Sequence, residues 1–270
     1  MDVLIFAGQS NMQGEAESRP IIQPIKNAYE YYHKSKKLIP LNHPIGEYIY
    51  DENGAFLLGQ ATDKNGSLVP AFCKEYLKLT QTNGVVAIST ACGNTTISEW
   101  QKGTKRYDIA IEKIKSGIEK AKELGEIGKI YFVWFQGESD AYKQTPPIVY
   151  FELMNYFKND LKKEISFDKF CIIKTGYFAS VCEWCKKVIK NKHGRRLNIE
   201  ELKALDNGIM SAQEGLIDND QDFVMLYKGC PTLSLNKENM NPFVDGHYNA
   251  KTLDLVGRKA ARALAKLNKV

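Results

Sequence analysis

Short apolar runs alternate with longer amphipathic stretches along most of the chain. The short runs are rich in β-branched residues and are predicted to be strands: Val3–Ala7, Gly84–Ser89, Lys129–Phe135, Phe170–Gly176 and Phe223–Tyr227. Apolar runs of this length are typical of strands covered by helices on both faces, as in a parallel sheet. The pattern therefore predicts an α/β fold built on a parallel sheet of about five strands.

The longer stretches are predicted to be the covering helices. In residues 106–125, Ile111, Ile114 and Ile118 recur at near-helical spacing with charged residues on the other face, and Gly125 is placed to end the helix. Similar patterns predict helices over Pro147–Leu161, Ile199–Gly215 and Ala250–Leu267.

Residues 19–66 do not follow this alternation. The segment is rich in prolines and tyrosines and contains the turn-like sequences DENG and DKNG. We expect a long loop excursion over one edge of the sheet, and its aromatic content favours an ordered loop that faces the substrate. Because the sequence contains no internal repeat, low-complexity tract or linker, we expect a single domain over residues 1–270.

Composition and charge narrow the functional classes. The chain has 270 residues, of which 43% are hydrophobic, enough to cover a full core. Its net charge of +5 arises from 37 basic and 32 acidic residues spread along the sequence without an arginine-rich block, so nucleic-acid binding is not expected. No apolar run approaches the ~20 residues of a membrane span. No leader pattern precedes the first strand, so we expect a cytoplasmic protein without a membrane partner, unless a leader has been removed.

Six cysteines are scattered through the chain, and the apolar surroundings of Cys92 and Cys171 are typical of reduced, packed thiols. The sequence CEWC, Cys182–Cys185, has the spacing of a redox or metal site. No second pair of this kind and no nearby histidine pair completes a zinc site, so a structural role is favoured.

Polar residues gather directly after the predicted strands. GQSNMQG follows the first strand, TACGNTTISEW the second and QGESDA the third, whereas NPFVDGHYNA follows the fifth after a longer turn. Because open parallel sheets bind ligands beyond the carboxyl ends of their strands, these loops are expected to meet at one edge.

Residues of these loops suit acyl transfer to a serine. A serine becomes a nucleophile when a histidine removes its proton and a carboxylate orients that histidine. Ser10, His247 and Asp245 are the candidates for these roles, since the other histidines lie in the excursion or in a basic turn. In the alternative reading, Ser10 caps the following helix and Asp245 marks a helix start beside an exposed histidine.

The tetrahedral intermediate of acyl transfer also needs hydrogen-bond donors directed at its oxyanion. The backbone amides of Ser10 and Gly93 and the side-chain amide of Gln136 are the candidates. Glycine suits position 93 because close approach of the backbone to a reacting carbonyl leaves no room for a Cβ atom. Glu138 and Asp140 form an alternative pair for acid–base cleavage of a glycoside, but two carboxylates on one short loop better suit hydrogen bonds that hold the turn.

Four of these stretches together resemble the SGNH hydrolases, specifically carbohydrate esterase family six and the sialate O-acetylesterase domain. AGQSNMQG resembles the nucleophile block of that family, GNTTISEW its glycine block, WFQGESDA its third block and DGHYNAKTLDLVGRKAA its histidine block. The blocks occur in the family order and span nearly the whole chain.

The resemblance implies a flavodoxin-like three-layer α/β/α sandwich and the removal of acetyl groups from sugar hydroxyls, without a metal or organic cofactor. It implies Ser10 as the nucleophile, His247 as the base, and Gly93 and Gln136 as oxyanion donors. The implied partner is an acetylated carbohydrate of the sialic acid or xylo-oligosaccharide type. The alternatives are a sugar-binding protein that has lost the chemistry, and an esterase for lipids or small non-sugar esters.

Two positions depart from the family pattern. The family spaces its acid and histidine as D-x-x-H, whereas one residue separates Asp245 from His247, so Asp245, Asp140 and a dyad without an acid stay open. Asn94 stands where the family has a second glycine, which leaves open which amide of that turn faces the oxyanion. Residues expected to contact the substrate or support the site are Gln9, Asn11, Asn94, Glu138 and Asp140.

Overall fold

The core of the protein is one mostly parallel sheet. The computed structural model describes residues 1–18, 23–60 and 65–268, and within them seven strands form this sheet in the order β3-β2-β6-β1-β7-β8-β9. The strands are β1 Asp2–Gly8, β2 Ala28–Tyr32, β3 Lys37–Pro40, β6 Val85–Ser89, β7 Ile130–Phe135, β8 Lys169–Ile173 and β9 Phe223–Tyr227. Neighbouring strands are parallel except β2 and β3, which are antiparallel at the edge. Because β1 lies between β6 and β7 in the middle of the sheet, all its residues are buried.

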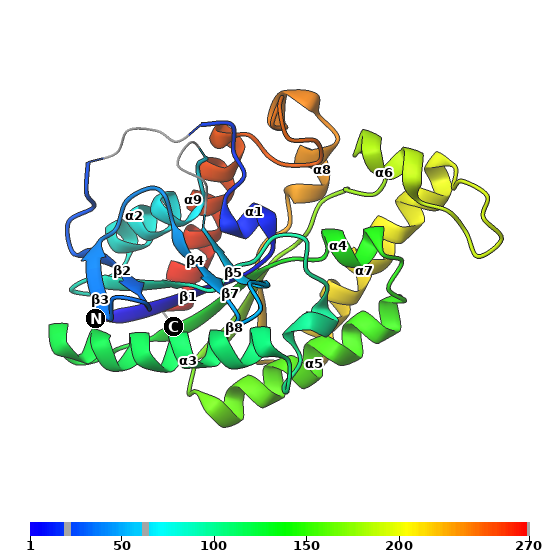
Figure 1. The fold of residues 1–270 in the computed structure, drawn as a ribbon. Helices are drawn as coiled ribbons and strands as arrows, with labels where there is room; N and C mark the ends of the chain where they lie inside the picture. The colour runs from blue at the N-terminus through cyan, green and yellow to red at the C-terminus, as the bar shows by residue number, and fades with distance from the viewer. Residues whose placement is uncertain (19–22, 61–64, 269–270) are drawn as a thin grey trace.

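Helices cover both faces of this sheet (Figure 1). One face carries α2 Val69–Leu79 and α9 Ala250–Leu267, and the other carries α3 Lys105–Ala121, α5 Pro147–Glu164 and α7 Ile199–Asn219. The side chains of β1 alternate accordingly, since Val3 and Ile5 join the core beneath α3, whereas Leu4 and Phe6 join the core beneath α2 and α9. The predicted three-layer α/β/α sandwich is confirmed.

Short helices follow the carboxyl ends of the strands. They are α1 Ser10–Gln13, η1 Ile97–Trp100, α4 Glu138–Tyr142, α6 Glu183–Val188 and α8 Cys230–Ser234, and two further turns are η2 Lys122–Leu124 and η3 Lys237–Asn239. The predicted strands and long helices are present with ends shifted by a few residues. The helix α2 is absent from the prediction, although its buried Val69, Phe72, Cys73 and Tyr76 repeat at helical spacing. None of the helices in the described part of the chain is long and apolar enough to cross a membrane.

The predicted loop excursion over residues 19–66 is wrong for most of its length. β2 and β3 extend the sheet beyond β6, and β4 Gly46–Tyr50 pairs with β5 Phe56–Gln60 in a separate two-stranded sheet. Residues 19–22 and 61–64 of this range lie outside the described residues. The prediction missed these strands because they are short and mix polar with apolar residues, so none forms a continuous apolar run.

A buried group of ionisable side chains joins these added strands to the rest of the fold. Lys113 Nζ of α3 lies 3.5 Å from Glu47 Oε2 of β4, and the Glu30 carboxylate of β2 accepts a hydrogen bond from the Gly46 amide at 2.6 Å. Burial raises the pKa of Glu30 to about 8, although the charge of Lys113 opposes the shift. Because a buried charge is costly without a partner, these side chains hold β2, β4 and α3 together.

The central strand β1 ends at Gly8 in a conformation that favours glycine. The φ angle of Gly8 is +136°, and a Cβ atom there would overlap the backbone carbonyl of Phe135 on β7. The amide of Gln9 donates a hydrogen bond to this same carbonyl at 3.1 Å. The chain therefore leaves the sheet while still bonded to β7, and Ser10 then begins α1.

We expect Gly8→Ala to lower the free energy of unfolding by roughly 3 kcal/mol, because the new Cβ atom meets a backbone group that has no room to move. Gly103→Ala is the matched control, since Gly103 also has a positive φ of +89° but has open space around it. We expect this control to lose about 1 kcal/mol. Urea unfolding measures both losses, and equal values would show that the approach to Phe135 imposes no constraint.

Candidate active site

Ser10 and His247 meet at the carboxyl edge of the sheet, although they are 237 positions apart in the sequence. Ser10 is the first residue of α1, directly after β1, and His247 lies in the loop that leads to α9. The Ser10 Oγ atom is 2.8 Å from His247 Nε2. The hydroxyl of Ser10 does not cap α1, because Gln9 occupies the N-cap position. The structure thus brings together the two residues expected to act as nucleophile and base.

The hydrogen bond made by the other ring nitrogen, Nδ1, shows which tautomer of His247 is present. Nδ1 lies 2.9 Å from the backbone carbonyl oxygen of Asp245. Because a carbonyl oxygen only accepts hydrogen bonds, Nδ1 carries the proton and Nε2 presents its lone pair to Ser10. Burial lowers the pKa of His247, and its hydrogen bond to Asp245 partly offsets that shift. The imidazole is therefore neutral near neutral pH, as a general base must be.

Asp245 contacts the imidazole through its main chain and not through its carboxylate. The carboxylate atom Oδ2 instead accepts a hydrogen bond from the backbone amide of Trp184 at 3.2 Å. Between Asp245 and His247 the chain turns at Gly246, whose φ is +76°. With only one residue in between, the carbonyl of Asp245 reaches Nδ1, so the expected contact between its carboxylate and the ring is wrong.

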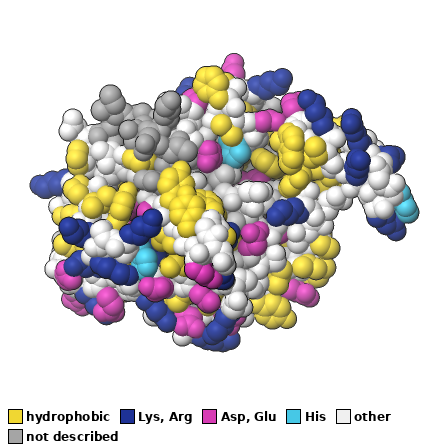
Figure 2. Space-filling view, viewed as in Figure 1, with side chains coloured by type: hydrophobic (Ala, Val, Ile, Leu, Met, Phe, Trp, Pro, Cys, Tyr) yellow, Lys and Arg dark blue, Asp and Glu magenta, His cyan; other side chains and the backbone are white. Residues whose placement is uncertain are grey.

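A hollow of about 270 Å³ opens in front of Ser10. It is lined by Gln9, Ser10, Glu15, Gly93, Asn94, Ser139, Tyr142, Phe178, Trp184 and His247. Hydrophobic side chains gather on the side of the hollow that α4 and α6 form (Figure 2). The described residues 23–60 contribute nothing to this lining, so for them the predicted substrate-facing loop is wrong.

Three aromatic residues line the hollow and were not among the predicted site residues. We call them the aromatic wall: Tyr142, Phe178 and Trp184. The rings of Tyr142 and Trp184 lie 5.1 Å apart at 42°, and Phe178 meets the ring of His247 edge to face at 6.1 Å. Trp184 is 54% exposed, which is unusual for so large an apolar ring. Phe178 and Trp184 follow β8, so their place after a predicted strand is the sequence signal for this wall.

Gln136 lies behind the site and not in it. Its side chain is fully buried, and its Nε2 atom donates to the carbonyl of Thr95 at 2.9 Å and to Asp140 Oδ2 at 2.5 Å. Both amide hydrogens are therefore engaged, and none is directed at the hollow. The expectation that Gln136 supplies an oxyanion donor is wrong, because its amide ties the end of β7 to the loop after β6.

The two predicted backbone donors differ in their partners. The Gly93 amide donates to Gln13 Oε1 at 2.8 Å, whereas the Ser10 amide donates to no acceptor among the described residues. Gly93 lies close to the nucleophile, since a Cβ atom built on it would be 3.5 Å from Ser10 Cβ. Asn94 has a φ of +58° and lines the hollow beside it. The Ser10 amide is thus the donor that stands free at the nucleophile.

Asn11 joins three loops around the nucleophile. Its Nδ2 atom donates to Glu138 Oε1 of α4 at 2.8 Å, and its Oδ1 atom accepts from the amide of Tyr248 at 3.3 Å. Gln9 adds a second link to α4, because its Oε1 atom accepts from the Ser139 amide at 3.0 Å. These side chains support the site, and of them only Gln9 and Ser139 also line the hollow.

Glu138 and Asp140 are buried and bind protein groups. Glu138 binds Asn11, and Asp140 Oδ2 accepts from the amide of Ile97 at 2.9 Å as well as from Gln136. Burial raises the pKa of both carboxyls. Neither lines the hollow, so the alternative of an acid–base pair for glycoside cleavage, and that of Asp140 as the orienting acid, lose their geometric basis.

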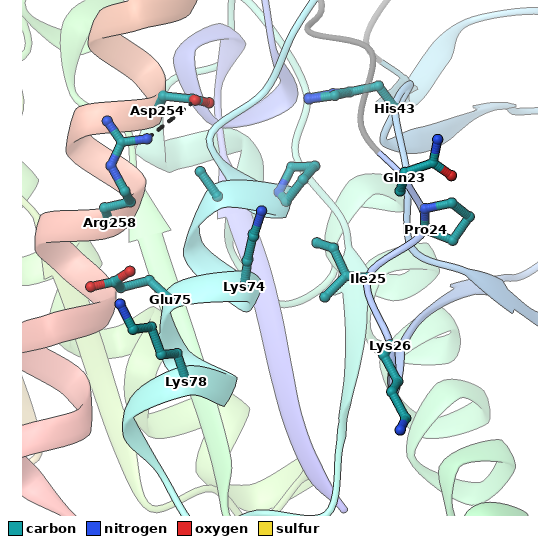
Figure 3. A pocket seen from close by; sticks show the side chains of 12 residues that line it. Gln23, Pro24, Ile25, Lys26, His43, Lys74, Glu75, Lys78, Asp254 and Arg258 are labelled. Atoms are coloured by element: carbon teal, nitrogen blue, oxygen red, sulfur yellow. Dashed lines mark hydrogen bonds and ion pairs between the residues drawn. The ribbon is translucent and has the colours of Figure 1, made fainter.

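A larger cavity of about 760 Å³ lies elsewhere, between α2, α9 and residues 23–26 (Figure 3). Lys26, Lys74, Lys78 and Arg258 line it together with Glu75 and Asp254. Asp254 pairs with Arg258 at 3.3 Å. None of the predicted site residues lines this cavity. Although it is larger than the hollow in front of Ser10, we therefore do not expect the reaction to take place in it.

Comparisons with known proteins identify the family and the fold of the chain. The family model described as carbohydrate esterase, sialic acid-specific acetylesterase matches residues 1–221. A solved structure from Arabidopsis thaliana is 16% identical with a TM-score of 0.69, and the match covers 98% of each chain. NanS is 15% identical with a TM-score of 0.61, over 99% of this chain and 98% of its own.

A third solved structure, a carbohydrate acetylesterase from Xanthomonas citri, is 14% identical with a TM-score of 0.50 and covers 100% of this chain and 57% of its own. No curated protein matches the chain. At these identities the solved structures show a shared fold, whereas the family model covers most of the chain.

The Asp245→Asn variant tests whether the main chain orients His247. In a triad whose aspartate carboxylate holds the imidazole, this change costs about 10⁴-fold in kcat. Because the carbonyl of Asp245 makes the contact here, we expect Asp245→Asn to lose less than about tenfold in hydrolysis of 4-nitrophenyl acetate. His247→Ala is the control that removes the base, and an Asp245→Asn variant as inactive as this control would contradict the assignment.

Proposed function

Because the chain belongs to the sialic acid-specific acetylesterase family of carbohydrate esterases, we propose that it removes O-acetyl groups from carbohydrates through an acetyl-serine intermediate on Ser10. The observation that carries this proposal is the 2.8 Å contact between Ser10 Oγ and the unprotonated Nε2 atom of His247. A serine held in this way by a neutral imidazole is poised to lose its proton as it attacks.

The first step forms the acetyl-enzyme. His247 Nε2 takes the Ser10 proton while Oγ attacks the acetyl carbonyl, and the carbonyl of Asp245 stabilises the imidazolium through Nδ1–H. The oxyanion accepts a hydrogen bond from the free amide of Ser10. The Gly93 amide now donates to Gln13 Oε1. It becomes a second donor to the intermediate when the oxyanion replaces this amide oxygen as its acceptor.

The second step releases both products. The imidazolium returns its proton to the sugar oxygen, so the carbon–oxygen bond of the tetrahedral intermediate breaks and the sugar leaves as an alcohol. Water then takes the place of the sugar, His247 removes one of its protons, and the hydroxide attacks the acetyl-serine. Acetate leaves, Ser10 regains its proton, and the free enzyme is restored.

The lining of the hollow supports a sugar substrate. Aromatic faces such as those of Tyr142 and Trp184 pack against the apolar faces of sugar rings, and the exposed indole is free to do so. Among the described lining residues Glu15 is the one charged side chain, and no lysine or arginine is present. This charge favours a neutral acetylated sugar, such as a xylo-oligosaccharide, over a sialic acid that carries its own carboxylate. A lipid esterase is less well supported, because the hollow is small, at about 270 Å³.

Acetate release from a panel of O-acetylated xylo-oligosaccharides, hexoses and sialic acids tests the proposal. We expect the neutral sugars to react fastest, and Ser10→Ala to lose at least about 10⁴-fold in kcat. Ser139→Ala, which removes another serine of the same hollow, is the matched control and should stay active. Labelling by a fluorophosphonate should depend on Ser10, and an unlabelled parent protein would identify an inactive sugar-binding relative.

The pH dependence of kcat/KM reports the base of the free enzyme. Burial lowers the pKa of His247 below 6.5, so its neutral form persists to lower pH. We therefore expect activity to fall with decreasing pH through a midpoint below 6.5, where the imidazole gains a proton. Glu15 also lines the hollow with a raised pKa, so Glu15→Gln serves as the control and should leave this limb in place. A midpoint above 6.5 would contradict a base whose pKa is lowered by burial, as that of His247 is.

A further inference from the structure

Cys182 and Cys185 lie directly beside the aromatic wall, and the proposed reaction uses neither thiol. Cys182 is the N-cap residue of α6, Cys185 lies in its first turn, and Trp184 of the wall stands between them. Both thiols are buried, with 3% and 0% of each residue exposed. We call this pair the dithiol.

The two side chains are placed for a disulfide. The Cys185 amide donates to Cys182 Sγ at 3.4 Å, so the sulfur of the first cysteine already lies over the backbone of the second. Residues three apart in a helix have Cα atoms roughly 5 Å apart, inside the range of about 4.4–6.8 Å that disulfides require. The two thiols also share a hydrogen bond, so the sulfurs lie within reach of each other.

The dithiol differs from the other cysteines of the chain. A hydrogen bond from Cys185 lowers the pKa of Cys182 and raises that of Cys185. The remaining thiols lie singly in the core, and burial raises the pKa of each: Cys73, Cys92, Cys171 and Cys230. No group of potential ligands in the described ranges surrounds the pair as a metal site would require. Because its sulfur accepts the Cys185 amide at the start of α6, Cys182 is the better placed nucleophile, with Cys185 in position to follow it.

The dithiol is linked to the reacting atoms through few contacts. The amide of Trp184 donates to the Asp245 carboxylate at 3.2 Å, and the carbonyl of the same Asp245 holds His247 Nδ1 at 2.9 Å. The Trp184 ring also contacts Tyr142 of the same wall. A change in the first turn of α6 therefore moves the aromatic wall directly. Another cavity of about 540 Å³ lies against this turn and is lined by Val181 and Glu183, the residues on either side of Cys182.

We propose that Cys182 and Cys185 form a reversible disulfide by exchange with a low-molecular-weight disulfide, and that this bond reshapes the aromatic wall and weakens sugar binding. The Cys182 thiolate attacks one sulfur of the small disulfide, whose S–S bond breaks to release one thiol. Cys185 then loses its proton and attacks the Cys182 sulfur, which forms the protein disulfide and releases the second thiol. Two protein thiols are oxidised, and one small disulfide is reduced.

The chemical part of the proposal is tested on the full chain with oxidised glutathione as the probe. We expect intact mass and non-reducing peptide mapping to show a Cys182–Cys185 cross-link with the loss of two hydrogen atoms, which dithiothreitol reverses. Cys185→Ser should stop at a mixed disulfide on Cys182, and Cys171→Ala, which removes a solitary buried thiol, should still form the cross-link. Glutathione retained on Cys182 in the parent protein, or no reaction at all, would overturn the proposal.

The structural part is read from Trp184 and from substrate binding. Trp184 is 54% exposed while Trp100 and Trp134 are buried, so oxidation should quench the emission of the exposed indole and leave the buried ones unchanged. We expect the KM for an acetylated sugar to rise by about threefold or more, while hydrolysis of 4-nitrophenyl acetate, which needs no sugar contact, changes less than about twofold. A cross-linked protein with unchanged emission and unchanged KM would refute the effect on the wall.

Only the KM readout rests on the proposed function. The cross-link and the Trp184 emission are therefore also measured in the Ser10→Ala background, where no turnover is needed. If the parent protein hydrolyses no acetylated sugar but both backgrounds show the cross-link and the quenching, the proposed function fails and the dithiol stands. If acetate is released but no cross-link forms, the dithiol fails alone.

Discussion

The close approach of β1 to β7 is the constraint on which the site depends. At Gly8 the chain passes so near the Phe135 carbonyl that no side chain fits, and it turns out of the sheet there. This turn places Ser10 at the start of α1, beyond a strand that is buried on both faces. The nucleophile is therefore positioned by the central, buried strand of the sheet, and the other loops of the site meet it there.

Those loops are held by buried polar side chains. Asn11 binds α4 on one side and the backbone of the histidine loop on the other. Gln136 and Asp140 join the loop after β7 to the loop after β6, with β1 between these two strands. Each of these groups is out of water and satisfied mainly by the protein, so a displaced loop would leave polar atoms without partners. The carboxylates of Glu138 and Asp140 therefore hold the loops together, and only a few groups take part in the proposed reaction.

Sequence patterns predicted the features of the protein that depend on the chemical type of its side chains. The apolar runs located five strands of the sheet, and the polar residues after them located Ser10, Gly93 and His247 at one edge. Features that depend on backbone direction escaped prediction. A carbonyl oxygen has no sequence signature, so the role of Asp245 depended on the turn at Gly246, and the direction of the Gln136 amide depended on which acceptors surround it. The aromatic wall escaped because the site was inferred from polar residues after the strands, whereas Phe178 and Trp184 follow β8 as aromatic residues.

The use of a peptide carbonyl to orient His247 has a consequence for how such a site tolerates change. Every residue type carries the same carbonyl, so substitutions at position 245 that preserve the loop leave the orienting atom in place. The orientation of His247 thus depends on the path of the main chain around Gly246 and not on the identity of a side chain. In such a site the acidic residue can be replaced while the geometry of the histidine is kept. A search for a matching acid among distant relatives would therefore not find the orienting contact.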